Sequence, residues 1–212
     1  MELKTPDNIK IRAANADDAL IGTQLIYLPM GELGDFLFGL GEPGMAQEVL
    51  GKLFAEACNL FSHQFAYIAI KSDQVVGLLL AYPGPLIRNL ALTMAKQLLN
   101  IYGVPRMGRF IWNAVPLSRI REPAPDEYFI NTLAVLPDYQ GQGIGTQLLA
   151  YAEYQAKSEG MRKCALDVDI ENDGACRLYS RLGYSIVNSV RSKRLIRRIG
   201  HQGLYRMVKI LA

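Results

Sequence analysis

The most constraining feature of this chain is a glycine-rich turn, which reads Gln140-Gly141-Gln142-Gly143-Ile144-Gly145-Thr146. Hydrophobic patterns predict a strand before it, over 128–135, and a helix after it, over 143–157. Glycine allows a tight turn and close approach of the backbone to a ligand. The first amides of a helix have no partner within the helix and, with the helix dipole, favour anions. The turn therefore predicts a phosphate-binding site, unless the glycines serve only to reverse the chain.

Two known phosphate-binding motifs fit this turn poorly. The P-loop needs a lysine after its last glycine, whereas Thr146 follows Gly145 directly. The dinucleotide-binding fingerprint matches Gly141 and Gly143, but Thr146 stands at its third glycine. Four residues, 137–140, also separate the strand from the first glycine, and too few residues follow for the rest of that sheet. A small dinucleotide-binding protein remains an alternative.

Periodic patterns along the rest of the chain predict a mixture of helices and strands. Pro29 is expected to end the first helix, and the basic stretch 191–198 is expected to be a solvated loop. Strands are predicted at 9–12, 65–70, 75–82, 128–135, 164–170, 184–190 and 204–210, and helices at 19–28, 44–61, 86–102, 143–157 and 174–182.

Composition and charge set bounds on partners and location. Half of the 212 residues are hydrophobic and the formal net charge is +3, so neither a nucleic acid nor a membrane is expected as a partner. The cysteines form no Cys-x-x-Cys pair and the two histidines lack metal-ligand spacing, so no metal site is expected. Residues 1–10 lack an apolar signal core, and no apolar run approaches the roughly 20 residues that span a bilayer. We expect one cytoplasmic domain over 1–212, with a homodimer left open.

The segment 133–145 resembles the central motif of the GNAT superfamily of N-acetyltransferases. In that motif a strand ending in Val-x-Pro is followed by Arg or Gln, two variable residues, Gly, one residue, and Gly or Ala. Gln140, Gly143 and Gly145 fill the fixed places, and 172–184 resembles the family's next helix. The resemblance implies an α/β (α+β) fold, with a mostly antiparallel, splayed sheet of six or seven strands and flanking helices. It covers the order of elements except 86–126, which is interpreted as a helical insertion.

The resemblance also implies a reaction and a cofactor. It implies direct transfer of the acetyl group of acetyl-coenzyme A to a primary amine of a small molecule or peptide, in a ternary complex. A non-catalytic acetyl-coenzyme A sensor on the same fold is the alternative. Main-chain groups of Leu133 and Val135 are implied to bind the pantetheine arm, and Asn172 either binds the cofactor or only caps a helix. The implied cofactor-binding residues are Leu133, Ala134, Val135, Gln140, Gly141, Gln142, Gly143, Ile144, Gly145, Thr146, Asn172 and Tyr179.

The same resemblance suggests catalytic groups. Tyr179 matches the family's general acid, which protonates the leaving thiolate, although a packing role is the alternative. The Val135 N–H is expected to stabilise the oxyanion. Many members place a glutamate on the central strand, where this chain has Phe129-Ile130-Asn131. Asn131 and Glu127 are therefore the candidates for the remaining catalytic roles, with Asp126, Asp167 and Asp169 as further carboxylates.

The insertion 86–126 is basic and contains Trp112, the only tryptophan. We hypothesise that it forms a wall of the acceptor pocket and favours acidic or polar acceptors. The alternative is an amphipathic helix with solvated basic side chains. Its basic residues are Arg88, Lys96, Arg106, Arg109, Arg119 and Arg121. The identity of the acceptor does not follow from the sequence.

Overall fold

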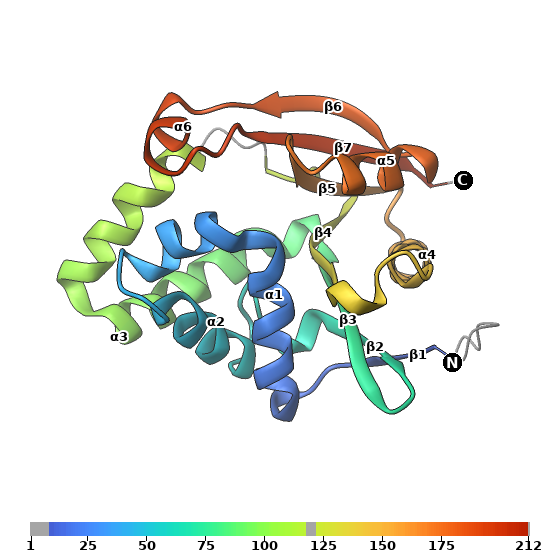
Figure 1. Cartoon of the computed structure of the whole chain (residues 1–212), viewed down its shortest axis with the longest axis horizontal. Helices are drawn as coiled ribbons and strands as arrows, with labels where there is room; N and C mark the ends of the chain where they lie inside the picture. Colours follow the sequence, from blue (N-terminus) through green and yellow to red (C-terminus); the bar gives the residue numbers. More distant parts are fainter. Residues whose placement is uncertain (1–8, 118–121, 212) are drawn as a thin grey trace.

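A twisted sheet forms the centre of the protein (Figure 1). The computed structural model describes residues 9–117 and 122–211, and within them seven strands pair in the order β1-β2-β3-β4-β5-β7-β6. Only β4 and β5 pair in parallel; the other neighbours are antiparallel. This confirms the predicted mostly antiparallel sheet. The strands are β1 (Lys10–Ala13), β2 (Ala66–Lys71), β3 (Gln74–Pro83), β4 (Glu127–Val135), β5 (Lys163–Asp169), β6 (Ser185–Val190) and β7 (Leu204–Ile210).

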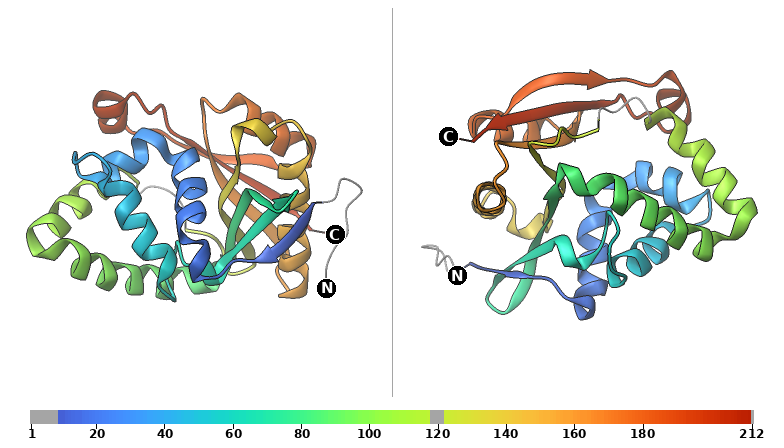
Figure 2. Two further views of the ribbon diagram at one scale, coloured as in Figure 1. Left: turned by 60° about the horizontal axis from the view of Figure 1, so that its bottom comes forward. Right: turned by 180° about the vertical axis from the view of Figure 1, so that it is seen from behind.

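Helices cover both faces of this sheet. Two views show α1, α2 and α3 gathered on one side and α4 on the other (Figures 1 and 2). A π-helical turn, Asp35–Gly39, follows α1. The helices are α1 (Ala19–Gly34), α2 (Met45–Ala55), α3 (Ile87–Ala114), α4 (Ile144–Ser158), α5 (Asp173–Arg181) and α6 (Lys193–Ile199).

The central strand β3 is buried on both faces, which explains its unbroken apolar sequence. Leu78 and Leu80 point into the core formed with α1, α2 and α3. The alternate residues Leu79 and Ala81 point into the core formed with α4 and β5. Side chains of successive strand residues point to opposite faces, so one strand joins two hydrophobic cores.

The sheet opens between β4 and β5. These strands pair only from Glu127, opposite Lys163, to Ile130, opposite Leu166. Beyond that point β4 continues on β3 and β5 continues on β7. The β3–β4 register shifts between Ile130 and Thr132, so Asn131 is the extra residue of a β-bulge. The predicted splay is present, and we call the point of divergence the fork.

A buried ion network lies at the fork. Arg206 of β7 binds Asp167, the first β5 residue beyond the paired segment, through Nε–Oδ1 and Nη2–Oδ2 contacts of 2.7 and 3.0 Å. Its Nη1 lies 3.8 Å from Glu127 Oε2, and its guanidinium carbon lies 5.1 Å from the centroid of Phe129. Burial raises the pKa of Asp167, and the charge of Arg206 opposes that rise.

Four expectations from the sequence differ from the structure. α1 extends past Pro29 to Gly34, but as two helical segments joined by a kink at Gly31, whose φ is 45°. α3 likewise consists of two segments joined by a kink at Gly103, whose φ is 68°. The stretch predicted as a basic loop contains α6, which Leu195 anchors by its burial and Gly200 ends in a left-handed conformation.

The remaining difference is α2, which ends at Ala55 rather than at residue 61. There the Asn59 amide donates to the Leu53 carbonyl at 2.8 Å, which turns the chain back. No helix in the described ranges is long and apolar enough to cross a membrane. The amino-terminal segment 1–8, and Arg119 and Arg121 of the insertion, lie outside those ranges.

Candidate active site

A cavity of about 610 Å³ occupies the opening between β4 and β5. We call it the main cavity. Its walls are the end of β4, the glycine turn, the first turn of α4, and α5, with α1 closing one side. All the predicted cofactor-binding residues except Gln142 line it. These are Leu133, Ala134, Val135, Gln140, Gly141, Gly143, Ile144, Gly145, Thr146, Asn172 and Tyr179.

The glycine turn presents backbone amides to this cavity. Gly141 and Gly143 have φ of 74° and 79°, values that side chains other than glycine rarely adopt. No side chain caps the start of α4 at Ile144, so its first amides are available to a bound anion. Gln142 instead contacts the outside of the turn, where it accepts a hydrogen bond from Lys71 Nζ at 2.7 Å.

The end of β4 also exposes backbone groups. The Leu136 N–H donates to Val76 on β3 at 2.9 Å. Successive backbone groups of a strand point to opposite edges, so the N–H and C=O of Val135 point toward the side that β5 has left. In agreement, Gln140 Nε2 donates to the Val135 carbonyl at 3.1 Å. The Val135 N–H is thus aimed at the opening.

Two polar side chains reach the cavity from the other wall. Asn172 Oδ1 accepts from Ala175 N–H at 3.0 Å, so it caps α5 and also lines the cavity. Tyr179 is 7% exposed. Burial, with a smaller contribution from Cys176, raises the pKa of Tyr179 to about 12. Its phenol therefore stays protonated at neutral pH and can donate a proton.

The structure does not bring the other two catalytic candidates to this cavity. The Asn131 amide donates to the Leu60 carbonyl and to Tyr82 Oη, both at 2.8 Å, which holds the bulge in place. Glu127 accepts from Ala124 N–H at 2.9 Å and faces Arg206. At about 3.3 Å per residue, Glu127 lies roughly 26 Å along β4 from Val135. The placement of both residues supports structural roles.

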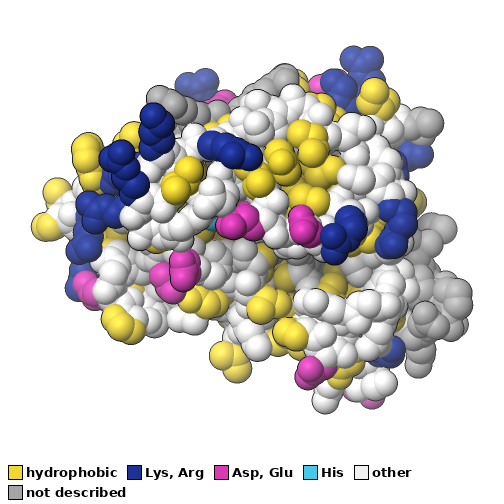
Figure 3. Space-filling model, turned by 45° about the horizontal axis from the view of Figure 1, so that its top comes forward, with side chains coloured by type: hydrophobic (Ala, Val, Ile, Leu, Met, Phe, Trp, Pro, Cys, Tyr) yellow, Lys and Arg dark blue, Asp and Glu magenta, His cyan; other side chains and the backbone are white. Residues whose placement is uncertain are grey.

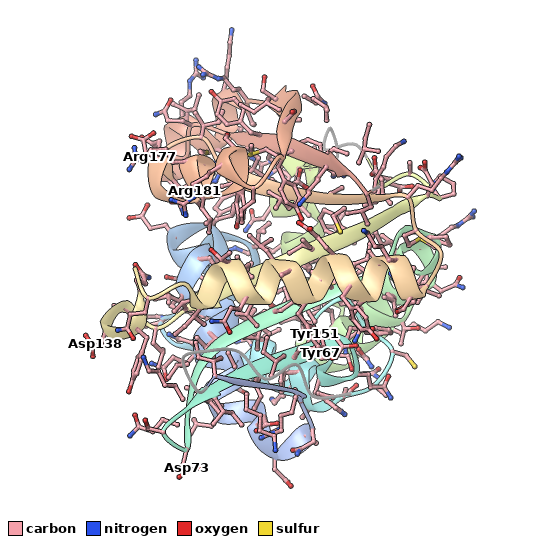
Figure 4. All side chains as sticks on the ribbon, turned by 90° about the vertical axis from the view of Figure 1, so that its right-hand side faces the viewer. Tyr67, Asp73, Asp138, Tyr151, Arg177 and Arg181 are labelled. Carbon is pink, nitrogen blue, oxygen red and sulfur yellow. The ribbon has the colours of Figure 1, made fainter. Side chains whose placement is uncertain are left out.

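Several residues that line the main cavity were not predicted from the sequence. Leu28 and Pro29 reach the cavity because α1 continues where an end was predicted. Arg181 of α5 also lines it, and Figure 4 shows Arg177 and Arg181 on the same side of the molecule as the turn that carries Asp138. The basic residue that follows the Leu-Tyr pair of this helix could have indicated Arg181 from the sequence. The other lining residues that were not predicted are Tyr139, Gly174, Ala175 and Leu178.

Two of the three thiols, those of Cys164 and Cys176, are poorly suited to act as nucleophiles. Burial raises the pKa of Cys164 to about 12, and burial also raises the pKa of Cys176. A neutral thiol attacks slowly, because the thiolate is the nucleophile. Among the described residues there is no group of three or more metal-type ligands.

A second cavity of about 340 Å³, the inner cavity, is lined by the end of α1, the end of β5 and residues 199–201. Asp169, at the end of β5, lines it with its side chain 34% exposed. Its Oδ2 lies 3.1 Å from Nε2 of His201, whose Nδ1 accepts from Gly203 N–H at 3.2 Å. With Nδ1 accepting, Nε2 holds the hydrogen and donates to Asp169. The Oδ1 of Asp169 accepts from the Glu171 N–H at 2.8 Å, so both oxygens of this carboxylate are oriented while the side chain remains partly exposed.

The model of the Acetyltransferase (GNAT) family matches residues 46–184, more than half of the chain. An uncharacterized N-acetyltransferase of Methanocaldococcus jannaschii is 41% identical over 71 residues, which is 33% of this chain and 31% of that protein. The chain thus spans about a third of the length of that relative.

Solved structures share the fold. An N-acetyltransferase of Staphylococcus aureus superimposes with a TM-score of 0.68 at 22% identity, over 93% of this chain and 98% of that one. An N-acetyltransferase of Thermoplasma acidophilum, solved with coenzyme A, has a TM-score of 0.54 at 12% identity, over 96% and 99% of the two chains. At these identities the likeness concerns the fold.

Proposed function

Because this chain belongs to the acetyltransferase (GNAT) family, we propose that it transfers the acetyl group of acetyl-coenzyme A to a primary amine of a small molecule or peptide. The observation behind the proposal is the main cavity. It joins an unpaired strand edge, an uncapped helix start and a buried, protonated phenol. The strand edge can pair with an extended amide chain, the helix start can bind a diphosphate, and the phenol can protonate a leaving thiolate.

Binding of the cosubstrate relies mainly on backbone groups. The amides from Gly141 to Thr146 hold its pyrophosphate, helped by the positive end of the α4 dipole. The pantetheine arm runs along the end of β4 as an added strand and pairs with Leu133 and Val135. Asn172 uses its oxygen to cap α5, and its amide nitrogen donates to the arm.

Acyl transfer then proceeds without a covalent enzyme intermediate. The neutral amine attacks the thioester carbonyl, and the Val135 N–H stabilises the negative charge that develops on its oxygen. The carbon–sulfur bond breaks as the carbon–nitrogen bond becomes an amide. Tyr179 donates its proton to the departing thiolate and regains one from solvent.

We infer that Asp169 accepts the proton that the amine loses. It stands beyond the fork on β5, and its orientation by His201 suits a base acting directly or through one water. The alternatives are engaged elsewhere, since Asp167 binds Arg206 and Asp126 lies 3.0 Å from Lys163. Asp169→Asn should lower kcat/KM for the amine about 100-fold and leave the Kd of coenzyme A unchanged. Equal loss of coenzyme A affinity would contradict this role.

The proposed function is tested by calorimetry with coenzyme A and by thiol release from acetyl-coenzyme A with a panel of amines. Micromolar binding, and thiol release that depends on both the amine and Tyr179, are expected. Binding without release with any amine would indicate a sensor, and stabilisation by a dinucleotide but not by coenzyme A would overturn the proposal.

A further inference from the structure

Resting on the proposed function, we propose that the acceptor amine carries an anionic group, and that arginines of α3 and α6 bind this group. The relevant space is a third cavity of about 600 Å³, the outer cavity, bounded by α1, the π-helical turn, α3 and α6. Figures 1 and 2 show α3 and α6 meeting at the end of the molecule away from α4.

The inner and outer cavities share two lining residues, Glu32 and Ile199. The linings of the main and inner cavities are neighbours in the chain: the main cavity includes Pro29 and Asn172, and the inner cavity includes Met30 and Glu171. The inferred path of the acceptor follows this order. With its nitrogen near the thioester, the acceptor extends through the inner cavity toward α3 and α6.

The charge changes sign along this path. Acidic side chains line the inner cavity, namely Glu32, Asp169 and Glu171, and they favour a cationic amine before it is deprotonated. The outer cavity is lined by Arg109, Arg194 and Arg198, against Asp35 and the shared Glu32. Figure 3 shows Lys and Arg side chains gathered on the α3–α6 side of this face and acidic ones nearer its middle. An acceptor with an amine at one end and an anion farther along matches this order.

The arginines of the outer cavity are available to a ligand. In the part of the chain that the structure describes, none of the three forms an ion pair. The Asp35 carboxylate accepts from Tyr27 Oη at 2.8 Å. Arg194 stacks on Trp112, with its guanidinium carbon 4.5 Å from the ring centroid. Stacking uses the face of the guanidinium and leaves its N–H edges for a carboxylate or phosphate.

A suitable probe carries its anionic group several bonds from the amine. An extended peptide advances about 3.3–3.6 Å per residue, so the third α-carbon of a tripeptide lies roughly 7 Å from the first. A tripeptide with an acidic third side chain is thus a suitable probe for the inferred class.

The test compares kcat/KM, by thiol release, for the amides of alanyl-alanyl-glutamate and alanyl-alanyl-glutamine. The wild-type protein should prefer the glutamate peptide about tenfold, and added salt should reduce this preference. A third peptide with phosphoserine in the last position distinguishes a carboxylate site from a phosphate site. Arg194→Gln with Arg198→Gln should abolish the preference while the Kd of coenzyme A stays unchanged, which also shows that the variant is folded.

Arg197→Gln is the matched control, because Arg197 lies on α6, is exposed and lines none of the three cavities. It should retain the preference. Equal rates for the charged and neutral peptides, or a preference that survives the double substitution, would overturn this inference and leave the proposed function intact. Absence of thiol release with every amine would overturn both.

Discussion

The two sides of the fork are built in different ways. The proposed cofactor side comes mainly from two short segments, 133–146 and 172–181, which Leu28 and Pro29 of α1 complete, and we expect it to bind mainly through backbone groups. The acceptor side joins the end of α1, α3, the end of β5 and α6, and presents side chains. Backbone geometry is fixed by local glycines and strand ends, so a cosubstrate common to a family is bound by contiguous motifs. Side-chain pockets depend on distant segments meeting, so they are free to vary.

If both sides depend on the fork, then breaking its ion network should impair both. Arg206→Met leaves Glu127 and Asp167 buried without their cation, and we expect a loss of about 3–5 kcal/mol in the free energy of unfolding at neutral pH. Because burial raises the pKa of Asp167, lowering the pH protonates that carboxyl and removes its uncompensated charge. The loss should therefore shrink under acidic conditions. Urea denaturation at several pH values measures it.

Lys209→Met provides the control on the same strand. Lys209 binds Glu153 at 2.7 Å, but both side chains are partly exposed, so a smaller loss is expected. Two results would contradict the idea that the fork supports both binding sites. One is a loss of stability in Arg206→Met no larger than in Lys209→Met, and the other is weaker binding of coenzyme A alone or of the amine alone.

Tyr179→Phe should separate chemistry from binding on the cofactor side. Removal of the general acid is expected to lower kcat by about 100-fold or more, with little change in the Kd of coenzyme A. Because the pKa of Tyr179 is raised to about 12, the donor form persists below that pH. Loss of the proton from Tyr179 should therefore not limit kcat at pH 7–10. An unchanged kcat in the variant would remove Tyr179 from the mechanism.

Gly143→Ala tests whether backbone shape alone determines cofactor affinity. A side chain at φ 79° costs roughly 1–2 kcal/mol, so coenzyme A affinity should fall about tenfold, while KM for the amine stays the same. Gly160→Ala imposes a similar strain at φ 72° beyond the end of α4 and should lower stability only. Calorimetry and thermal melts of both variants distinguish these effects. Similar affinities in the two variants would contradict the prediction.

Arg181→Gln gives the smallest expected effect. A charge at the mouth of the main cavity should contribute about threefold to coenzyme A affinity, and less at high salt, because the site is exposed. Arg177→Gln is the matched substitution, since Arg177 does not line the cavity and lies 4.0 Å from Asp173. An equal effect of the two would mean that general charge, rather than position, is responsible.

The sequence predicted one side of the fork much better than the other. The glycine turn, the end of β4 and the start of α5 follow from neighbouring residues, so Gln142 was the only wrongly placed member of the predicted lining. The role assigned to Glu127 rested on nearness in sequence, but an extended strand carries it far from the cavity. Asn131 stands at the bulge, yet its amide is occupied by Leu60 and Tyr82.

The acceptor side could not be predicted, because its elements form through long-range packing. α6 depends on the burial of Leu195, which a basic, loop-like stretch does not reveal. The second segment of α1 follows a kink at Gly31, whose positive φ the pattern around Pro29 does not reveal. The pairing of Arg194 with Trp112 joins two residues that are far apart in the sequence. The hypothesis of a basic acceptor wall stays a prediction, and it did not include α6, which packs beside the insertion through Arg194 and Trp112.

The position of α6 has a consequence for how such enzymes diversify. It forms the tip of the hairpin between β6 and β7, and β6 is the outermost strand, with nearly all of its residues exposed. Changes of sequence within 191–203, apart from those at the buried Leu195 and Gly203, disturb few packed residues. A member of the family can therefore exchange this segment and bind other amines, while its binding site for the cosubstrate stays the same. Grafting this segment between family members offers a direct route to redesigned selectivity.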